Sequence, residues 1–299
     1  MSAVLQITRA GPLTSIQDLG RFGMLRHGIS ASGPMDRTAY LDAGQFSGGG
    51  QGGIEFTMAG LEFSIASGLC RVGLAGGNFV LRVNGQALAW PGAAEIGTGD
   101  TLAVTPGAWG NYGYLRFDGD IVAPPTMGSI ATSSRAGLGG LDGRALRVGD
   151  VIELAGSGAE PMVPAIRDRL DGPIRTIWGI HADLFSQALR QKFLDSSYTI
   201  STRLDRMGVR LNDDGKLFAD ASNLSLVSDA IVPGDIQILG DGTPIVLMRD
   251  HQPTGGYPRI ATVITADLDR FGQVRPGSAV AFEPVTVDHA HALLRGSKT

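Results

Sequence analysis

Glycine and proline divide this chain into short apolar runs, and that spacing limits the possible folds more than any other feature. There are 44 glycines and 15 prolines in 299 residues. The runs between them, such as residues 61–66, 79–83 and 245–248, are too short for typical helices and are rich in β-branched and aromatic residues. Runs of this kind between turn residues are typical of strands in sandwiches and barrels. We therefore predict a mainly β fold with a few short helices.

Two turns and four helices can be placed on this pattern. Asn84-Gly85 lies between two apolar runs and predicts a type I′ hairpin, and residues 240–242 predict a second hairpin in the same way. We expect the first helix over residues 34–46, with Ser32 or Gly33 near its cap. The other helices are expected over residues 183–193 with Asp183 as the cap, from Asp267 onward, and over residues 288–294.

The stretch with the fewest structural signals, residues 156–173, suggests a domain boundary near residue 165. We predict an N-terminal β domain over residues 1–165 and a C-terminal β domain over residues 166–299. Both halves consist of β segments with one or two short helices.

Composition and missing motifs exclude several classes of function. A formal charge of −4 gives no general attraction for nucleic acid. The single cysteine, Cys70, excludes an internal disulfide, and its apolar neighbours favour a buried, inert thiol. No signal peptide, membrane span, Walker loop, zinc helix or biotinylation segment is visible. We expect a cytoplasmic protein that has no metal site and no covalently bound cofactor.

The first candidate site combines residues 14–23 with residues 27–36, two glycine-rich segments with many polar side chains. Gln17, Asp18, Arg21, Ser32 and Asp36 are suited to hydrogen-bonding a planar polar ligand that the glycines allow to approach. Alternatively, Asp18 and Arg21 form an ion pair within a turn, while Ser32 and Asp36 cap a helix. The residues themselves leave both interpretations open.

Two further segments lie in the C-terminal half. Arg206 and Arg210, four residues apart in a strand-like segment, could clamp a carboxylate or imide; an ordinary ion pair with Asp205 is the alternative. Residues 250–258 place Asp, His, Gln, Thr and Tyr between two apolar strands. Buried polar groups need partners, and loops on rigid β scaffolds often carry function. This loop therefore favours a binding or catalytic role over a self-bonded turn.

The same segments resemble the biotin-dependent carboxyltransferase-like family, which includes allophanate hydrolase subunit 2, the C subunit of 5-oxoprolinase and the carboxyltransferase domain of urea carboxylase. The resemblance is collinear from about residue 6 to residue 285. It is carried by residues 9–21, 28–36, 54–55, 124–129, 137–144, 205–211, 232–237, 244–248 and 250–261.

The resemblance implies two tandem cyclophilin-like β-barrel domains and a function as the C subunit of an ATP-dependent 5-oxoprolinase. Such a hydrolase complex would cleave 5-oxo-L-proline to L-glutamate together with a B-like subunit, similar to allophanate hydrolase subunit 1, and a separate A subunit. One alternative is a carboxyltransferase component that acts on urea or a related amide with carboxybiotin from a carrier protein. Another is a non-catalytic regulator resembling the antagonist of a sporulation kinase inhibitor.

The resemblance also implies a set of site residues. For a small amide or lactam substrate, we expect Arg206 to bind an anion, Asp250 to move a proton or orient the ligand, and Tyr257 to hydrogen-bond. Ile130 departs from the family pattern, in which an arginine often follows Met-Gly-Ser. If that arginine binds substrate in active members, this chain is mainly a binding subunit. The expected substrate-binding residues are Gln17, Asp18, Arg21, Ser32, Asp36, Glu55, Gln237, Gln252 and Thr254.

Overall fold

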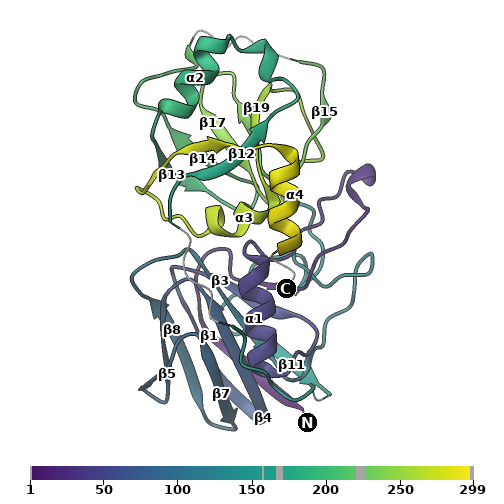
Figure 1. Cartoon of the computed structure of the whole chain (residues 1–299). Coiled ribbons are helices and arrows are strands. Elements are labelled where there is room, and N and C mark those ends of the chain that lie inside the picture. Colours follow the sequence, from purple (N-terminus) through teal and green to yellow (C-terminus); the bar gives the residue numbers. More distant parts are fainter. Residues whose placement is uncertain (1, 157, 166–170, 220–225, 297–299) are drawn as a thin grey trace. The chain divides into compact units, whose positions relative to one another are not determined.

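The computed structural model describes residues 2–156, 158–165, 171–219 and 226–296 (Figure 1). The chain forms two compact units: Met1–Gly23 with Ala31–Asp168, and Met24–Ser30 with Arg169–Thr299. The expected boundary at residues 165–166 adjoins residues outside the described part, so its position stays a prediction. The assignment of Met24–Ser30 to the second unit had no signal in the sequence.

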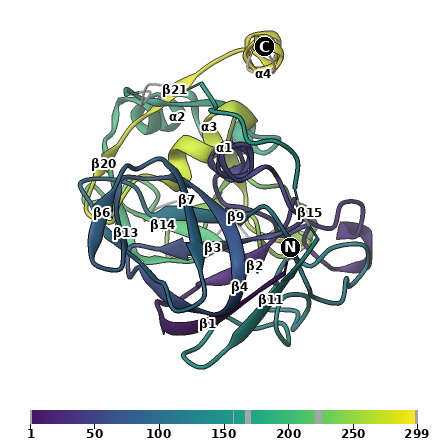
Figure 2. The ribbon, with the colours of Figure 1, turned by 90° about the horizontal axis from the view of Figure 1, so that it is seen from below.

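The N-terminal unit is built around one long strand, β4 (Leu61–Gly76). Its first part pairs with β1 (Ala3–Ala10) and β8 (Thr101–Pro106), and its second part pairs with β7 (Gly92–Gly97) and β9 (Tyr112–Phe117). Gly68 lies between the two parts with a φ of 87°, which β-carbon-bearing residues rarely adopt. This change of partners lets an eleven-stranded sheet curl around its own interior (Figure 2).

The remaining strands complete the N-terminal sheet. Inward-facing side chains of the whole sheet, including Leu5, Phe63, Val72 and Leu115, form one continuous hydrophobic core. The strands are β2 (Ser15–Gln17), β3 (Gly53–Thr57), β5 (Phe79–Val83), β6 (Gln86–Leu88), β10 (Asp120–Ile121) and β11 (Val151–Ala155).

Helix α1 (Arg37–Ser47) packs against β4 and β9 (Figure 1). Its N-cap is Asp36, whose carboxylate accepts a hydrogen bond from the Ala39 amide at 2.9 Å. The prediction that Ser32 or Gly33 lies near the cap was wrong, because an aspartate three residues before a free amide satisfies it directly. The alternative interpretation, in which Asp36 caps a helix, is confirmed. Close approach of the helix to β4 depends on Gly73, where an added Cβ would lie 2.5 Å from the Ser47 nitrogen.

The C-terminal unit holds an eight-stranded sheet in the order β20-β13-β14-β17-β16-β19-β12-β21. All neighbours are antiparallel except β12 and β21. A separate two-stranded sheet joins β15 (Asp229–Ala230) to β18 (Thr254–Gly255). The main strands are β12 (Ile174–Trp178), β13 (Tyr198–Leu204), β14 (Gly208–Asn212), β16 (Asp235–Ile238), β17 (Pro244–Leu247), β19 (Arg259–Val263), β20 (Ala279–Val280) and β21 (Phe282–Pro284).

The helices of this unit differ in their starting points from the sequence prediction. The expected helix at residues 183–193 is a short 3-10 turn, Ala182–Leu184, followed by α2 (Gln187–Asp195). Ser186 caps α2 by accepting from the Leu189 amide. The prediction that Asp183 caps this helix was therefore wrong. Helix α3 (Thr265–Gly272) begins before Asp267, and α4 (Val287–Gly296) begins at its expected position within one residue; a 3-10 turn also spans Leu25–His27.

Several local predictions are confirmed. Asn84 and Gly85 have φ values of 51° and 82° between β5 and β6, as a type I′ turn requires. The second hairpin joins β16 to β17. Cys70 is buried and free, and burial raises its pKa to about 12, so the thiol is inert at neutral pH. No helix in the described residues is long and apolar enough to cross a membrane.

Candidate functional site

Asp18 lies at the centre of the first polar cluster, in the N-terminal unit just after β2. Its carboxylate accepts hydrogen bonds from the Ser129 hydroxyl at 2.6 Å, the Ile130 amide at 2.8 Å and the Gly20 amide at 2.8 Å. Charge-assisted bonds of this kind are stronger than neutral ones. Asp18 therefore fixes the loop around residues 126–132 onto the end of β2.

Gln17 and Arg21 also bond to the loop at residues 126–132, and each bonds in addition to residues 32–33. The Gln17 amide nitrogen donates to the Ser15 hydroxyl and the Thr132 carbonyl, and its oxygen accepts from the Gly33 amide. The Arg21 guanidinium, 2% exposed, donates to the carbonyls of Thr126 and Ala131 and to the Ser32 hydroxyl. Ser32 has a φ of 56°, an unusual conformation that these contacts hold in place.

Glu55 and Asp36 meet through a buried tyrosine. The Tyr114 hydroxyl donates to the Glu55 carboxylate at 2.8 Å and accepts from the Asp36 amide at 2.7 Å, while Glu55 also accepts from the Met35 amide. Burial, followed by the negative charge of Glu55, raises the pKa of Tyr114 well above its usual value. The Tyr114 hydroxyl thus stays protonated and keeps its hydrogen bond to the Glu55 carboxylate.

In the C-terminal unit, Arg206 and Asp250 form a buried ion pair. The Arg206 Nε atom donates to Asp250 Oδ2 at 2.8 Å, and Nη2 donates to Oδ1 at 3.3 Å. Each residue is 5% exposed. Arg206 precedes β14, whereas Arg210 lies within it, so the predicted shared strand was wrong. The partner of Arg206 is Asp250, while Asp205 accepts from the amides of Met207 and Gly208.

The loop after Asp250 changes from buried to exposed along its length. His251 is buried with Nδ1 2.6 Å from the Gln252 carbonyl, and burial lowers the pKa of its ring. Gln252 is half-buried, Thr254 is exposed within β18, and Tyr257 is 40% exposed. The loop therefore offers solvent-facing hydrogen-bonding groups on a base fixed by Asp250.

Gln237 and Arg259 form a second polar cluster in the same unit. They lie opposite each other in the pairing of β16 with β19. Arg259 donates to Asp229 Oδ2 at 2.7 Å, to the Ala230 carbonyl at 2.7 Å and to Asp235 Oδ2 at 3.4 Å. Gln237 is 1% exposed, and among the described residues its side-chain oxygen and nitrogen have no hydrogen-bond partner.

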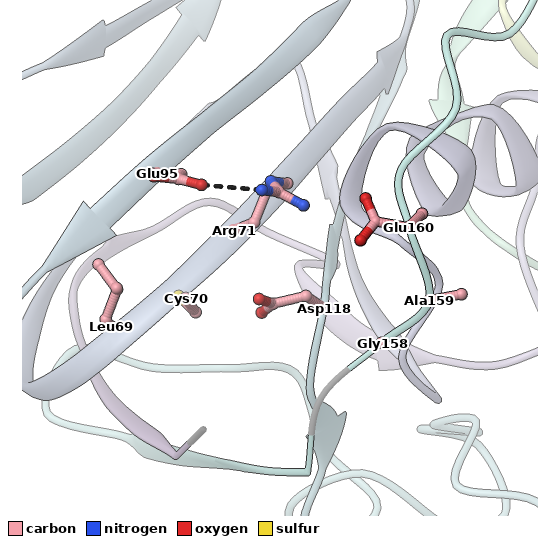
Figure 3. A pocket seen from close by; sticks show the side chains of 8 residues that line it. All are labelled: Leu69, Cys70, Arg71, Glu95, Asp118, Gly158, Ala159 and Glu160. Carbon is pink, nitrogen blue, oxygen red and sulfur yellow. Dashed lines mark hydrogen bonds and ion pairs between the residues drawn. The ribbon is translucent and has the colours of Figure 1, made fainter.

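A small cavity in the N-terminal unit lies apart from all of these predicted residues. Its volume is about 210 Å³. Figure 3 shows Arg71 on its wall, paired with Glu95 at 2.8 Å, with Asp118 and Glu160 nearby. The Arg71–Glu95 pair is largely exposed, and such pairs are weak. We assign no chemistry to this cavity.

Comparison with known proteins shows which family the chain belongs to. The model of the family described as "Carboxyltransferase domain, subdomain A and B" matches residues 27–284. The chain belongs to this carboxyltransferase family. This match confirms the family that the sequence motifs predicted. The two curled β units confirm the expected fold class.

The chain is similar to 5-oxoprolinase C subunits and to a urea amidolyase. The chain is 33% identical to the 5-oxoprolinase C subunit from Haemophilus influenzae, covering 94% of this chain and 91% of that protein, and 33% identical to the Escherichia coli protein of the same name, covering 96% and 93%. The crystal structure of the Kluyveromyces lactis urea amidolyase matches with a TM-score of 0.87 and 25% identity, over 99% of this chain. This chain spans 19% of the amidolyase.

The structure thus brings the predicted residues of each unit together in clusters. The two units differ in what these residues bond to. The N-terminal residues Gln17, Asp18 and Arg21 bond largely to the chain's own backbone. Sequence reasoning did not single out two buried arginines, Arg259 and Arg116. Arg259 lay inside the family motif at residues 250–261, whereas Arg116, whose guanidinium lies 4.1 Å from the Tyr40 ring centroid, sits in an apolar run with no local signal. No group of three potential metal-ligating His, Cys, Asp or Glu side chains occurs in the described residues.

Proposed function

We propose that this chain is the C subunit of an ATP-dependent 5-oxoprolinase that opens the lactam of 5-oxo-L-proline to give L-glutamate. The observation that carries this proposal is the extent of the match: it covers 91% and 93% of the C subunits of two 5-oxoprolinases, but 17% of the yeast urea amidolyase. The match thus includes most of the length of those C subunits, whereas it includes one part of the larger enzyme.

The proposed complex contains a B-like subunit together with a separate A subunit, and it works in the cytoplasm, where ATP is supplied. Lactam hydrolysis adds one water molecule across a stable amide bond, and ATP hydrolysis supplies the driving force. A lactam site needs donors for the carbonyl oxygen and a group that binds the substrate carboxylate. The donors that we propose are the side chains of Gln252, Thr254 and Tyr257. Asp250, held by Arg206, fixes the base of their loop.

For the N-terminal residues we propose a positioning role. Asp18, Arg21 and Glu55 are buried and bonded to backbone amides, carbonyls or Tyr114. These bonds support a scaffold that shapes the loops at residues 28–36 and 126–132. Substrate binding then falls to the C-terminal unit.

The second candidate function is transfer of a carboxyl group from carboxybiotin to urea or a related amide. It is favoured by the family description and by the 28% identity to the Saccharomyces cerevisiae urea amidolyase. This chemistry would require a separate biotin carrier protein.

Reconstitution with the B-like and A subunits separates these functions. We expect 5-oxo-L-proline to stimulate ATP hydrolysis by the complex, and urea to leave the rate at its basal level. Stimulation by urea together with a biotinylated carrier would favour the carboxyltransferase instead. A stable complex that responds to neither substrate would contradict both and favour a regulatory protein.

A further inference from the structure

Gln237 differs from every other predicted site residue in its surroundings. Its side chain is almost fully buried on β16, yet neither its amide nitrogen nor its oxygen has a hydrogen-bond partner among the described residues. Gln17, buried to the same extent, uses its nitrogen twice and its oxygen once. Burying polar atoms without partners costs free energy, so such groups are rare and need an explanation.

Gly255 of β18 lies against the Gln237 side chain, and β18 belongs to the small ribbon that it forms with β15. We call this ribbon the cover. An added Cβ at Gly255 would lie 2.5 Å from the Gln237 amide nitrogen, so the absence of a side chain at Gly255 leaves room for the carboxamide. Isolated two-stranded ribbons are only marginally stable. This ribbon is held by Arg259, which donates to the Asp229 carboxylate and to the Ala230 carbonyl.

Arg259 adds a second unused group beside Gln237. It lies directly opposite Gln237 across the β16–β19 pairing, and facing residues on one side of a sheet have neighbouring side chains. Its Nε atom is also buried without a hydrogen-bond partner in the described residues. One acceptor and at least two donor positions thus remain available beneath one thin cover.

We propose that Gln237 recognises a cis-amide edge, as found in a lactam or a cyclic urea, when the β15–β18 ribbon opens. A primary carboxamide presents a donor and an acceptor side by side. A cis-amide presents an N–H and a carbonyl in the complementary order, so two parallel hydrogen bonds form. The Arg259 Nε atom is placed to donate to a further ligand oxygen. The choice of the lactam as ligand rests on the proposed function, whereas the cis-amide chemistry does not.

Ligand-observed NMR on the full chain tests this site with simple probes. We expect 2-pyrrolidinone and 5-oxo-L-proline to bind, and N-methyl-2-pyrrolidinone, which lacks the N–H, to bind roughly 10- to 100-fold more weakly because both paired bonds are disturbed. Equal binding of the N-methyl compound, or no binding of either lactam, would overturn the proposal. Tighter binding of 2-imidazolidinone than of the lactams would support the site but identify a ureido group as its ligand.

The variant Gln237→Leu distinguishes a ligand site from a structural residue. It removes two unpaired polar atoms, so we expect an unchanged or raised midpoint of thermal unfolding together with loss of lactam binding. Gln17→Leu is the matched control: it breaks bonds that exist and should lower the midpoint. A lowered midpoint for Gln237→Leu, or unchanged lactam binding, would contradict the assignment. If the reconstituted complex cleaves 5-oxo-L-proline equally well with Gln237→Leu, the cis-amide site is wrong although the proposed function stands.

Asp229→Ala tests the cover. The substitution removes the ion pair between the ribbon and Arg259, and Asp229 is half exposed, so the fold should be retained. We expect tighter lactam binding than in the unsubstituted chain, because opening the ribbon costs less. Unchanged binding would show that the ribbon does not need to open, and weaker binding would show that the closed ribbon favours the ligand; either result would contradict the proposed opening.

Discussion

Asp250 and Arg206 illustrate how burial determines the effect of a single residue. Their ion pair is enclosed, with side-chain exposures of 6% each, whereas the Arg71–Glu95 pair is exposed at 31% and 65%. Removing one partner of a buried pair leaves an uncompensated charge, which costs far more than breaking a pair in water.

We predict that Asp250→Ala lowers the free energy of unfolding by about 3–5 kcal/mol, because Arg206 is left buried with its carboxylate partner gone. Urea denaturation gives this value. The control, Glu95→Ala, should lose less than about 1 kcal/mol, since its partner is solvated. Similar losses for the two variants would show that the Asp250 pair is not enclosed.

At this scale the sequence identified the polar residues but not their partners. Residues such as Asp18 and Gln17 carried an evident polar signal. Their bonds to Ser129, Ile130 and Thr132 depend on segments more than 100 positions away. A local pattern cannot distinguish a polar group that fixes a distant loop from one without a partner in the fold. Gln17 bonds to the distant Thr132 carbonyl, whereas the side chain of Gln237 has no hydrogen-bond partner in the described residues.

Packing of α1 on β4 depends on the missing side chain of Gly73. An added Cβ would meet the Ala43 carbonyl and the Ser47 amide of the helix backbone, neither of which can move without shifting the helix. We predict that Gly73→Ala lowers the free energy of unfolding by about 1–3 kcal/mol through overpacking. Gly97→Ala is a control in β7, where the new Cβ makes only ordinary van der Waals contact with Leu69. Equal stability of the two variants would contradict this view of the helix–sheet contact.

Asp267 links α3 to β12 through Arg175 and also bonds to Arg270. Burial alone would raise its pKa, but the bonds from Arg175 and Arg270 outweigh burial and lower the pKa below the ordinary value of 3.8. A carboxylate with a lowered folded-state pKa stabilises the fold above its unfolded pKa, and this stabilisation is lost as pH falls through the folded-state pKa.

We therefore predict that Asp267→Asn is destabilised at pH 7, and that its deficit relative to the unsubstituted chain shrinks as the pH is lowered below 3.8. Chemical denaturation at several pH values measures this difference. A deficit independent of pH would show that the charge of Asp267 contributes nothing to stability.

Strands and hairpins were the elements easiest to predict, because alternation and turn residues are local. Helix starts were less accurate: Asp36 and Ser186 cap α1 and α2, and each has a polar neighbour within four residues that also suits a cap. Which one is used depends on where the helix meets its sheet. The long strand β4 was predicted only in its first part, since its second part is interrupted by glycines that serve the bend and the helix contact.

For the whole molecule, the two-barrel fold and the family followed from ordered motifs spread along the chain. The two curled sheets confirm the fold class, and the comparisons confirm the family. The grouping of Met24–Ser30 with the second unit could not be predicted, because it depends on tertiary contacts and not on composition.

Glutamate release tests the assignment to a 5-oxoprolinase complex most directly. The B-like and A subunits are incubated with ATP and 5-oxo-L-proline, with and without this chain. We predict ATP-dependent glutamate formation only in the mixture that contains the chain. Equal glutamate formation in its absence, or none in the complete mixture while urea is consumed, would contradict that assignment.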